Sequence, residues 1–268
     1  MNICLFNSDE IGKPIALKDE RGEHLVKILH KKVGESFTAG IVGGASGTAV
    51  ITAINDEGIS FDFTASGDGK PLYPLKMIIG FPRPIQLKRL LRDVAALGVC
   101  EVHLCGTDLG EKSYMQSTLL EKGNAYKMLL DGTVQAGGTH VPELFLHKTL
   151  RECVEAVCPV IEPVEMTGGF DNLNHRLLLA LDNVRPTVSL GDAVRAVSGG
   201  TGGFDKLNYP EFCAVAAIGS ERGWTDKERD YFLQKGFTLC GMGCRIMRTE
   251  TAATVAGTII LNEMGYLK

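Results

Sequence analysis

Two glycine-bearing loops in the last third of the chain hold the residues best suited to bind a small ligand. The first loop, residues 219–223, follows an apolar run at 213–218, and the second loop, residues 242–249, opens into a helix-like segment. Glycine tolerates positive φ and has no side chain, so such loops bring bare backbone against a ligand. The candidate site is short of acid–base groups and holds Glu221, Arg245, Arg248 and Glu250. A site made mainly of backbone and apolar side chains suits a cofactor that carries its own reactivity.

Several other site chemistries lack their sequence signals. No G-x-G-x-x-G fingerprint follows the first strand of the alternating region, which argues against a dinucleotide-binding domain, and no G-x-x-x-x-G-K-[ST] phosphate loop occurs. The G-x-S-x-G nucleophile elbow is also absent, so no motif in the sequence supports a serine hydrolase.

The eight cysteines do not form a metal-binding pattern. Cys240 and Cys244 have a spacing that could ligate a metal, but no histidine or second close pair joins them. Most of the cysteines sit inside apolar runs, which is typical of buried, reduced thiols in a cytosolic protein. We therefore expect no metal cofactor.

Length and composition indicate an ordinary globular protein of two domains. The chain has 268 residues, with 44% hydrophobic and 22% charged residues. Its net charge of −4 gives no electrostatic argument for a nucleic-acid partner. No secretory signal pattern and no apolar run of roughly 20 residues is present, so we expect a cytoplasmic protein without a membrane partner.

The first part of the chain predicts a small β-rich domain. Short strand patterns at 36–42, 48–54 and 58–63 are separated by turn residues, and they follow a possible short helix at 24–31. Such closely spaced short strands suit a barrel. The polar segment 66–71 is typical of a linker.

From residue 75 the pattern changes to alternating strands and helices. Strands are predicted at 77–81, 99–105, 177–181 and 213–218, and helices at 85–97, 119–135, 226–235 and 250–263. Continuous apolar strands between helices predict a parallel sheet covered on both faces. Thr225 and Glu228 form a capping box, Gly236 is a plausible C-cap, and 199–203 is expected to be a surface loop. Ligands bind beyond the carboxyl ends of such strands, which is where 219–223 falls.

Two C-terminal motifs resemble those of one known family. Residues 217–224 resemble its Ile-Gly-Pro-Glu-Gly-Gly-Phe loop, and residues 242–252 resemble its Leu-Gly-x-Arg-Ile-Leu-Arg-Thr-Glu-Thr-Ala segment. Shorter similarities occur at 23–29, 32–35, 97–102 and 134–143. The family is that of the small-subunit ribosomal RNA (uracil-N3)-methyltransferases of the SPOUT class.

This resemblance implies a fold that periodicity alone does not predict. The expected fold class is α/β, with a small N-terminal PUA-like β-barrel at residues 1–70 that binds RNA. Residues 71–268 would form a C-terminal α/β trefoil-knot (SPOUT) methyltransferase domain. The resemblance also implies a homodimer that holds S-adenosyl-L-methionine near the subunit interface and acts on ribosomal RNA.

The resemblance further implies methyl transfer from the sulfonium to a base nitrogen, uracil N3 in the family. Alignment of donor and acceptor would supply much of the catalysis. The residues expected to bind the cofactor are Leu181, Gly219, Ser220, Glu221, Gly223, Met242, Gly243, Ile246, Met247 and Thr249. Arg248 and Glu250 are the catalytic candidates, and His24, Lys27, Lys31 and Arg245 are the candidates for RNA binding.

The sequence also departs from the family pattern. Ser220 and Arg222 replace a proline and a glycine in the first loop, and family arginines are missing at His30, in 107–110 and at Gly138. Fewer cations weaken phosphate neutralisation. Two alternatives therefore stay open, which are a non-catalytic RNA-binding or ribosome-assembly protein on the same scaffold and a nucleotide-dependent metabolic enzyme.

Overall fold

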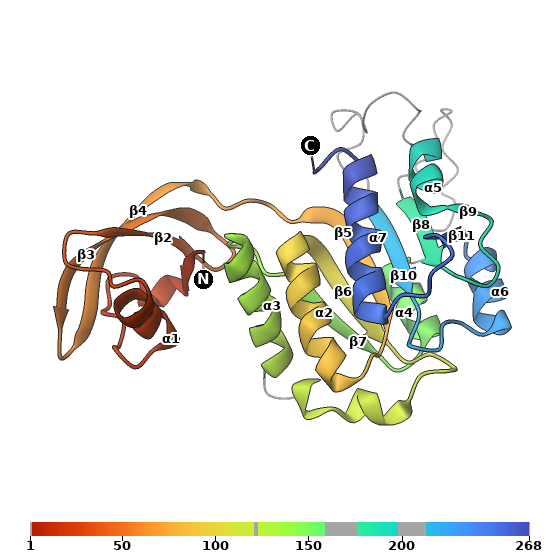
Figure 1. The fold of residues 1–268 in the computed structure, drawn as a ribbon, viewed down its shortest axis with the longest axis horizontal. Coiled ribbons are helices and arrows are strands. Elements are labelled where there is room, and N and C mark those ends of the chain that lie inside the picture. The colour runs from red at the N-terminus through yellow and green to blue at the C-terminus, as the bar shows by residue number, and fades with distance from the viewer. Residues whose placement is uncertain (1, 121–122, 159–175, 198–212, 268) are drawn as a thin grey trace, which may run out of the picture. The chain divides into compact units, whose positions relative to one another are not determined.

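A computed structural model describes residues 2–120, 123–158, 176–197 and 213–267 (Figure 1). The chain divides into two compact units, one made of residues 1–72 and 129–141 and the other of residues 73–128 and 142–268. The loop predicted at 199–203 lies outside the described residues. No helix in the described ranges combines the length and apolar character that crossing a membrane requires.

The first unit contains a four-stranded sheet in the order β1-β2-β3-β4. Its strands are β1 (Cys4–Phe6), β2 (Ser36–Ile41), β3 (Ala45–Asn55) and β4 (Gly58–Asp68). The β1–β2 pair is parallel and the other two pairs are antiparallel. The three predicted strands are confirmed. The pairs recorded for the described residues leave β1 and β4 as edges, so the sheet is not closed into a barrel.

Two local predictions in the first unit need correction. The segment 66–71 is not wholly a linker, because Gly67 pairs with Ser46 and Asp68 pairs with Ala45, which extends the β4 hairpin. The helix predicted at 24–31 begins earlier, as α1 (Glu20–Glu23), and continues as a π-helical turn at His24–Ile28. The Asp19 side chain caps α1 by accepting from the Arg21 backbone N–H.

Alternation along these strands builds the core of the first unit. Phe6, Phe37 and Phe61 are buried, with the rings of Phe6 and Phe61 stacked at 4.7 Å. Arg21 lies over the Phe6 ring and pairs with Glu10 and Asp19. The hydrogen bonds from Arg21 hold the pKa of both carboxyls below the ordinary value. This cluster ties the segment around α1 to strand β1.

The second unit is a seven-stranded sheet in the order β7-β6-β5-β10-β8-β11-β9, and every recorded pair is parallel. Its strands are β5 (Tyr73–Gly80), β6 (Val99–Cys105), β7 (Glu143–His147), β8 (Arg176–Leu181), β9 (Val188–Ser189), β10 (Cys213–Ile218) and β11 (Thr238–Gly241). The α-helices are α2 (Pro84–Leu97), α3 (Asn124–Ala136), α4 (Leu150–Val157), α5 (Leu190–Val197), α6 (Asp226–Gln234) and α7 (Thr249–Glu263). Residues 129–136 of α3 belong to the first unit. Short 3₁₀ turns occur at Ser8–Glu10, Lys112–Gln116 and Thr118–Leu120.

The predicted parallel α/β sheet is confirmed, with several elements added. The predicted strands and helices are all present within a few residues, except that α3 begins at Asn124 rather than near 119, where a 3₁₀ turn lies. The capping box of Thr225 and Glu228 is present at the start of α6, and Gly236 follows α6 with a φ of +81°. The sequence patterns did not reveal the short strands β7, β9 and β11 or the short helices α4 and α5.

Helices cover both faces of this sheet. Helices α2 and α7 pack side by side on one face, as Figure 1 shows, where α7 contacts β5 and β10. The other face carries a buried cluster in which Val154 of α4 and Phe232 of α6 pack with strand residues such as Ile78 and Val215. Burial on both faces explains why the strands are apolar without alternation.

Candidate functional site

Three loops that leave the same edge of the sheet form the candidate site. Ala180 in β8 pairs with Ala217 in β10 and with Leu239 in β11. This shared register ends the three strands at nearly the same level. The loops that follow Leu181, Ile218 and Gly241 therefore begin side by side at the carboxyl edge, as expected for a ligand site in a parallel sheet.

The loop after β10 is a tight turn that requires glycine at both ends. The backbone N–H of Gly223 donates to the Ser220 carbonyl at 2.8 Å, and Gly223 has a φ of +72°. A Cβ on Gly219 would lie 2.9 Å from the Gly223 Cα, which is too close for an unchanged turn. Thr249 Oγ1 donates to the Gly219 carbonyl at 3.3 Å and joins this turn to the start of α7.

Buried contacts hold the loop after β8. Asp182 accepts from Arg229 Nε at 3.0 Å and from the Arg185 backbone N–H at 2.6 Å. The side chains of Asp182 and Arg229 are only 1% and 7% exposed, so this ion pair is almost fully removed from water. Trp224 Nε1 donates to the Leu181 carbonyl at 2.9 Å. Trp224 is itself buried and acts as a core anchor.

The three loops surround a cavity of about 230 Å³. All ten residues predicted to bind the cofactor line it, namely Leu181, Gly219, Ser220, Glu221, Gly223, Met242, Gly243, Ile246, Met247 and Thr249, and Arg245 lines it too. The lining also includes Asp182, Asn183 and Arg222, which were not among the predicted cofactor contacts. The position of Asp182 and Asn183 directly after an apolar strand was the signal that could have identified them.

The predicted catalytic residues do not line this cavity. Arg248 is the exposed N-cap residue of α7, and Glu250 is buried in its first turn. Neither contributes to the cavity lining, although their neighbours Met247 and Thr249 do. Their catalytic roles stay predictions.

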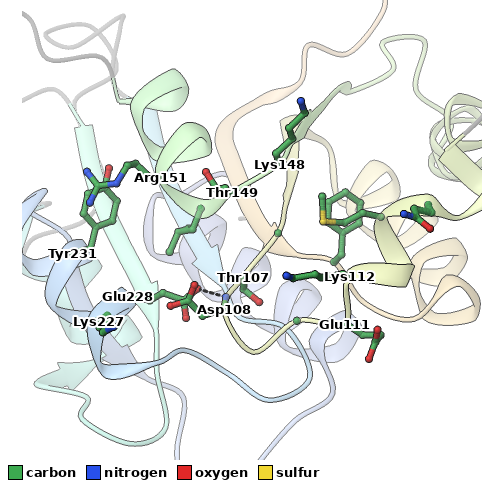
Figure 2. Close-up of a pocket in the computed structure, with 16 residues that line it drawn as sticks. Thr107, Asp108, Glu111, Lys112, Lys148, Thr149, Arg151, Lys227, Glu228 and Tyr231 are labelled. Atoms are coloured by element: carbon green, nitrogen blue, oxygen red, sulfur yellow. Dashed lines mark hydrogen bonds between the residues drawn. The ribbon is translucent and has the colours of Figure 1, made fainter.

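A second, larger cavity of about 880 Å³ lies at the carboxyl ends of β6 and β7 (Figure 2). Its charged lining consists of Asp108, Glu111, Lys112, Lys148, Arg151, Lys227 and Glu228. Glu228 accepts from the Asp108 backbone N–H at 2.9 Å and thereby links the loop after β6 to α6. Outside this lining, Arg83, directly before α2, pairs with Glu221 of the first cavity at 3.1 Å.

The residues predicted to bind RNA in the first unit are partly brought together. His24 and Lys31 line one cavity of about 380 Å³ within that unit. Lys27 is exposed, does not line that cavity and pairs with Glu23 at 2.7 Å.

The cysteine pair considered for a metal is not part of a metal-ligand cluster among the described residues. Cys240 is buried in β11 and Cys244 is exposed on the following loop. The cluster that the described residues do contain is His103, His147 and Cys153, which spacing in the sequence could not indicate.

Comparison with known proteins identifies the family. A family model described as an RNA methyltransferase domain matches residues 69–261. Ribosomal RNA small subunit methyltransferase E from Treponema pallidum is 38% identical over 265 residues, covering 97% of this chain and 91% of that protein. The chain belongs to this RNA methyltransferase family. Membership confirms the resemblance to the small-subunit ribosomal RNA methyltransferases of the SPOUT class and removes the metabolic-enzyme alternative.

Other members of the RNA methyltransferase family match the whole length of the chain. Ribosomal RNA small subunit methyltransferase E 1 from Borreliella burgdorferi is 28% identical over 260 residues, 97% of each protein. A crystal structure of ribosomal RNA small subunit methyltransferase E from Neisseria gonorrhoeae bound to S-adenosyl methionine is similar in fold. That match has a TM-score of 0.68 at 18% identity and covers 98% of this chain and 97% of that one.

The ion pair that holds the loop after β8 gives a testable prediction. Replacing Arg229 by methionine leaves the Asp182 carboxylate buried and unpaired, so we expect a loss of about 3–5 kcal/mol in the free energy of unfolding, measured with urea. The matched control is Arg185→Met. It removes an exposed pair with Asp230 at 2.9 Å, and we expect it to change stability by less than about 1 kcal/mol. Equal losses in the two variants would contradict the assigned role of Arg229.

Proposed function

We propose that this chain is an S-adenosyl-L-methionine-dependent RNA methyltransferase that methylates a base nitrogen of small-subunit ribosomal RNA, with uracil N3 as the target. One observation carries the proposal. The ten residues expected to bind the cofactor lie at the end of β8, in the loops after β10 and β11 and at the start of α7, and they line one cavity. The names of the Treponema pallidum and Borreliella burgdorferi relatives support the ribosomal RNA substrate.

The lining of the cavity fits this cofactor. Ser220 Oγ is buried and has no hydrogen-bond partner among the described residues, so it is available to a polar group of a ligand. The close approach of Gly219 to Gly223 exposes backbone where a side chain would fill the space. Leu181, Met242 and Met247 add apolar surface for the adenosyl group. When bound, S-adenosyl-L-methionine supplies an electrophilic methyl group on a sulfonium.

The smaller cavity suits the cofactor better than the larger one. The larger cavity is lined by seven charged side chains, whereas the smaller one is lined mainly by glycine-containing loops and apolar side chains. Its volume of about 230 Å³ lies just below the range of roughly 300–1,000 Å³ that is usual for small-molecule sites. Part of the ligand would therefore project from the mouth of the cavity, where the acceptor base can meet it.

The chain's own residues would mainly position the two reactants. Arg245 and Arg248 are exposed beside the cavity-lining residues 246 and 247, which suits contact with RNA phosphates. Glu250 is buried outside the lining, so it is the weaker of the two catalytic candidates. Holding the methyl donor and the acceptor nitrogen in line can lower the activation free energy by about 7 kcal/mol or more.

The first unit is proposed to bind RNA as a PUA-like barrel. The cavity that His24 and Lys31 share supports this assignment, because it combines an imidazole and an ammonium group at one concave surface. Lys27, already paired with Glu23, is expected to contribute less.

We also propose a trefoil knot in the second unit. Strand β11 is the last strand in the chain, yet it lies between β8 and β9, which precede it. The segment that links β8 to β9 must therefore cross over β11. In this segment, the backbone N–H groups of Asp182 and Thr187 donate to the carbonyls of Cys240 and Leu239, which lie in β11. A last strand inserted beneath an earlier loop supports a threaded chain, which is rare in proteins generally.

The proposed enzyme is a cytoplasmic homodimer with the cofactor near the interface. Apolar side chains at the rim of the cofactor cavity support this assembly. Ile246 is 81% exposed, and Val184 on the loop after β8 is 64% exposed. In a homodimer with the cofactor near the interface, the partner subunit would cover these two side chains.

A non-catalytic RNA-binding role is not favoured. The missing arginines and the Arg222 substitution motivated that alternative, but the Treponema pallidum and Borreliella burgdorferi relatives are named as methyltransferases. Arg222 is exposed at the cavity lining, so its side chain has solvent to extend into.

Calorimetric titration with S-adenosyl-L-methionine, followed by methyl transfer to small-subunit ribosomal RNA and mapping of the modified base, tests the proposal. We expect binding by the wild-type chain and transfer to one uracil N3. Ser220→Ala removes a hydroxyl worth about 0.5–1.5 kcal/mol when bonded, so we expect affinity to fall about 2- to 13-fold with no loss of stability.

Thr133→Val is the matched control for Ser220→Ala. Thr133 Oγ1 is likewise buried without a hydrogen-bond partner among the described residues, but it does not line the cofactor cavity. We expect this variant to keep the wild-type affinity. Absence of cofactor binding by the folded wild-type chain would refute the proposed activity.

The homodimer is tested by sedimentation velocity on the full chain. We expect a dimer at micromolar concentration, and we expect Ile246→Asp to shift the species toward monomer because it buries a charge at the interface. Ile28→Asp, at a 65% exposed residue of the first unit, is expected to leave the dimer intact. A wild-type monomer would contradict the proposed assembly.

A further inference from the structure

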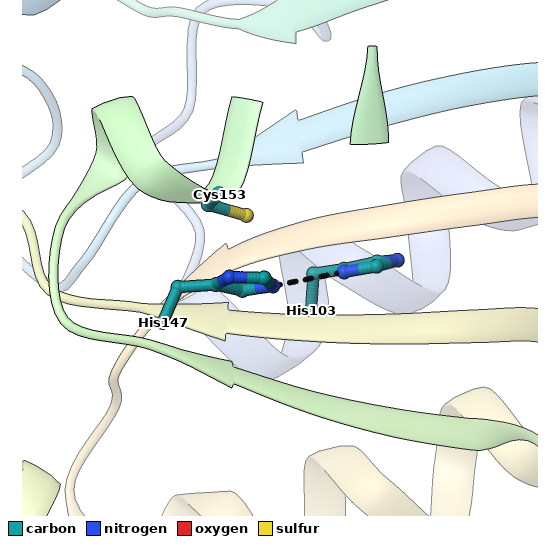
Figure 3. Close-up of side chains that lie close together, drawn as sticks. All are labelled: His103, His147 and Cys153. Carbon is teal, nitrogen blue, oxygen red and sulfur yellow. Dashed lines mark hydrogen bonds between the residues drawn. The ribbon is translucent and has the colours of Figure 1, made fainter. Parts of the chain in front are cut away.

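Two histidines and a cysteine meet beneath helix α4, away from the cofactor cavity (Figure 3). In the parallel pair of β6 and β7, His103 pairs with Phe145 and Cys105 pairs with His147. Because side chains alternate along a strand, His103 and His147 lie on the same face. Helix α4 contacts both strands on this face and places the buried Cys153 over them.

The potential ligand atoms of these three side chains converge. His103 Nδ1 lies 3.1 Å from His147 Nε2, and these two atoms and Cys153 Sγ all lie within 4.8 Å of one another. The ring of Phe145 stacks on His103 at 4.6 Å and fixes its plane. His103, His147 and Cys153 are 3%, 9% and 0% exposed, so the group is buried rather than a chance meeting of surface side chains.

A carboxylate orients one of the imidazoles. Glu101 Oε2 lies 2.9 Å from His103 Nε2, and the other oxygen of Glu101 pairs with Lys76 at 2.7 Å. A proton on Nε2 leaves Nδ1 bare and directed toward His147. Histidine ligands of metals commonly donate their second N–H to a carboxylate in this way.

We propose that His103 Nδ1, His147 Nε2 and Cys153 Sγ form a binding site for a divalent transition-metal ion, with Zn²⁺ as the best match to this donor set. Zn–N bonds of roughly 2.0–2.1 Å in a tetrahedron place two nitrogens about 3.3 Å apart, close to the 3.1 Å found here. Cys153 binds as a thiolate and releases its proton to water. Water occupies the fourth position.

The bound metal would cross-link neighbouring elements of the fold. Strand β7 is an edge strand of the sheet, and α4 is a short helix of eight residues. A metal bound by His103, His147 and Cys153 would join β6, β7 and α4, the elements that carry Lys148 and Arg151 at the large cavity. The role is therefore structural, and it is independent of the proposed methyl transfer.

Zinc titration of the full chain tests this site in a Cys244→Ser background, which removes the exposed thiol. We expect one equivalent of Zn²⁺ to bind and to raise the thermal unfolding midpoint. Co²⁺ in its place should show a thiolate-to-metal absorption band. His147→Gln should weaken Zn²⁺ binding by at least tenfold, and Cys153→Ala should abolish the absorption band.

Two further variants separate ligation from folding defects. Glu101→Gln keeps all three ligands but removes the orienting carboxylate, so we expect affinity to fall about 10- to 100-fold. Cys158→Ala removes another thiol at the end of α4 and should leave both binding and the Co²⁺ band unchanged. No stoichiometric binding, or binding unaffected by His147→Gln and Glu101→Gln, would show that the group is only a hydrogen-bonded histidine pair.

Discussion

The common register of three parallel strands is the constraint on which the candidate site depends. Ala180 is hydrogen-bonded on both sides, to the strand carrying Ala217 and to the strand carrying Leu239. Because the strands are parallel and level, three loops distant in sequence start at one edge. The Gly219–Gly223 turn, the Asp182–Arg229 ion pair and the Thr249 hydrogen bond then fix the loops against one another. If β11 were displaced from its place between β8 and β9, the cavity would lose one of its three walls.

The separation of tasks between the two cavities of the second unit follows from their linings. The small cavity presents backbone, a free hydroxyl and apolar side chains, which suits a compact ligand held by shape and a few hydrogen bonds. The large cavity presents three lysines and one arginine together with three carboxylates, which suits an extended polar partner more than a cofactor.

The sequence predicted the sheet and the cavity-lining residues because both leave strong local signals. Continuous apolar strands such as 213–218 can only be buried on both faces, and the ordered motif 242–252 marks the second loop. Strands β9 and β11 have only two and four residues, which is too short for a hydrophobic periodicity to be recognised. The order of the strands in the sheet could therefore not be predicted from the sequence pattern. The involvement of Asp182 depends on a partner 47 residues away, Arg229, and no local pattern contains that information. The cluster of His103, His147 and Cys153 arises in the same way, from strand register and helix placement.

Hydrogen–deuterium exchange of the full chain with and without S-adenosyl-L-methionine tests the location of the cofactor most directly. The account predicts slower exchange at the backbone amides of residues 182–185, 219–223 and 242–249, because these three loops enclose the ligand. Residues 106–112, which border the large cavity, should exchange at an unchanged rate. Protection confined to 106–112, or no protection at the three loops under saturating cofactor, would contradict the account.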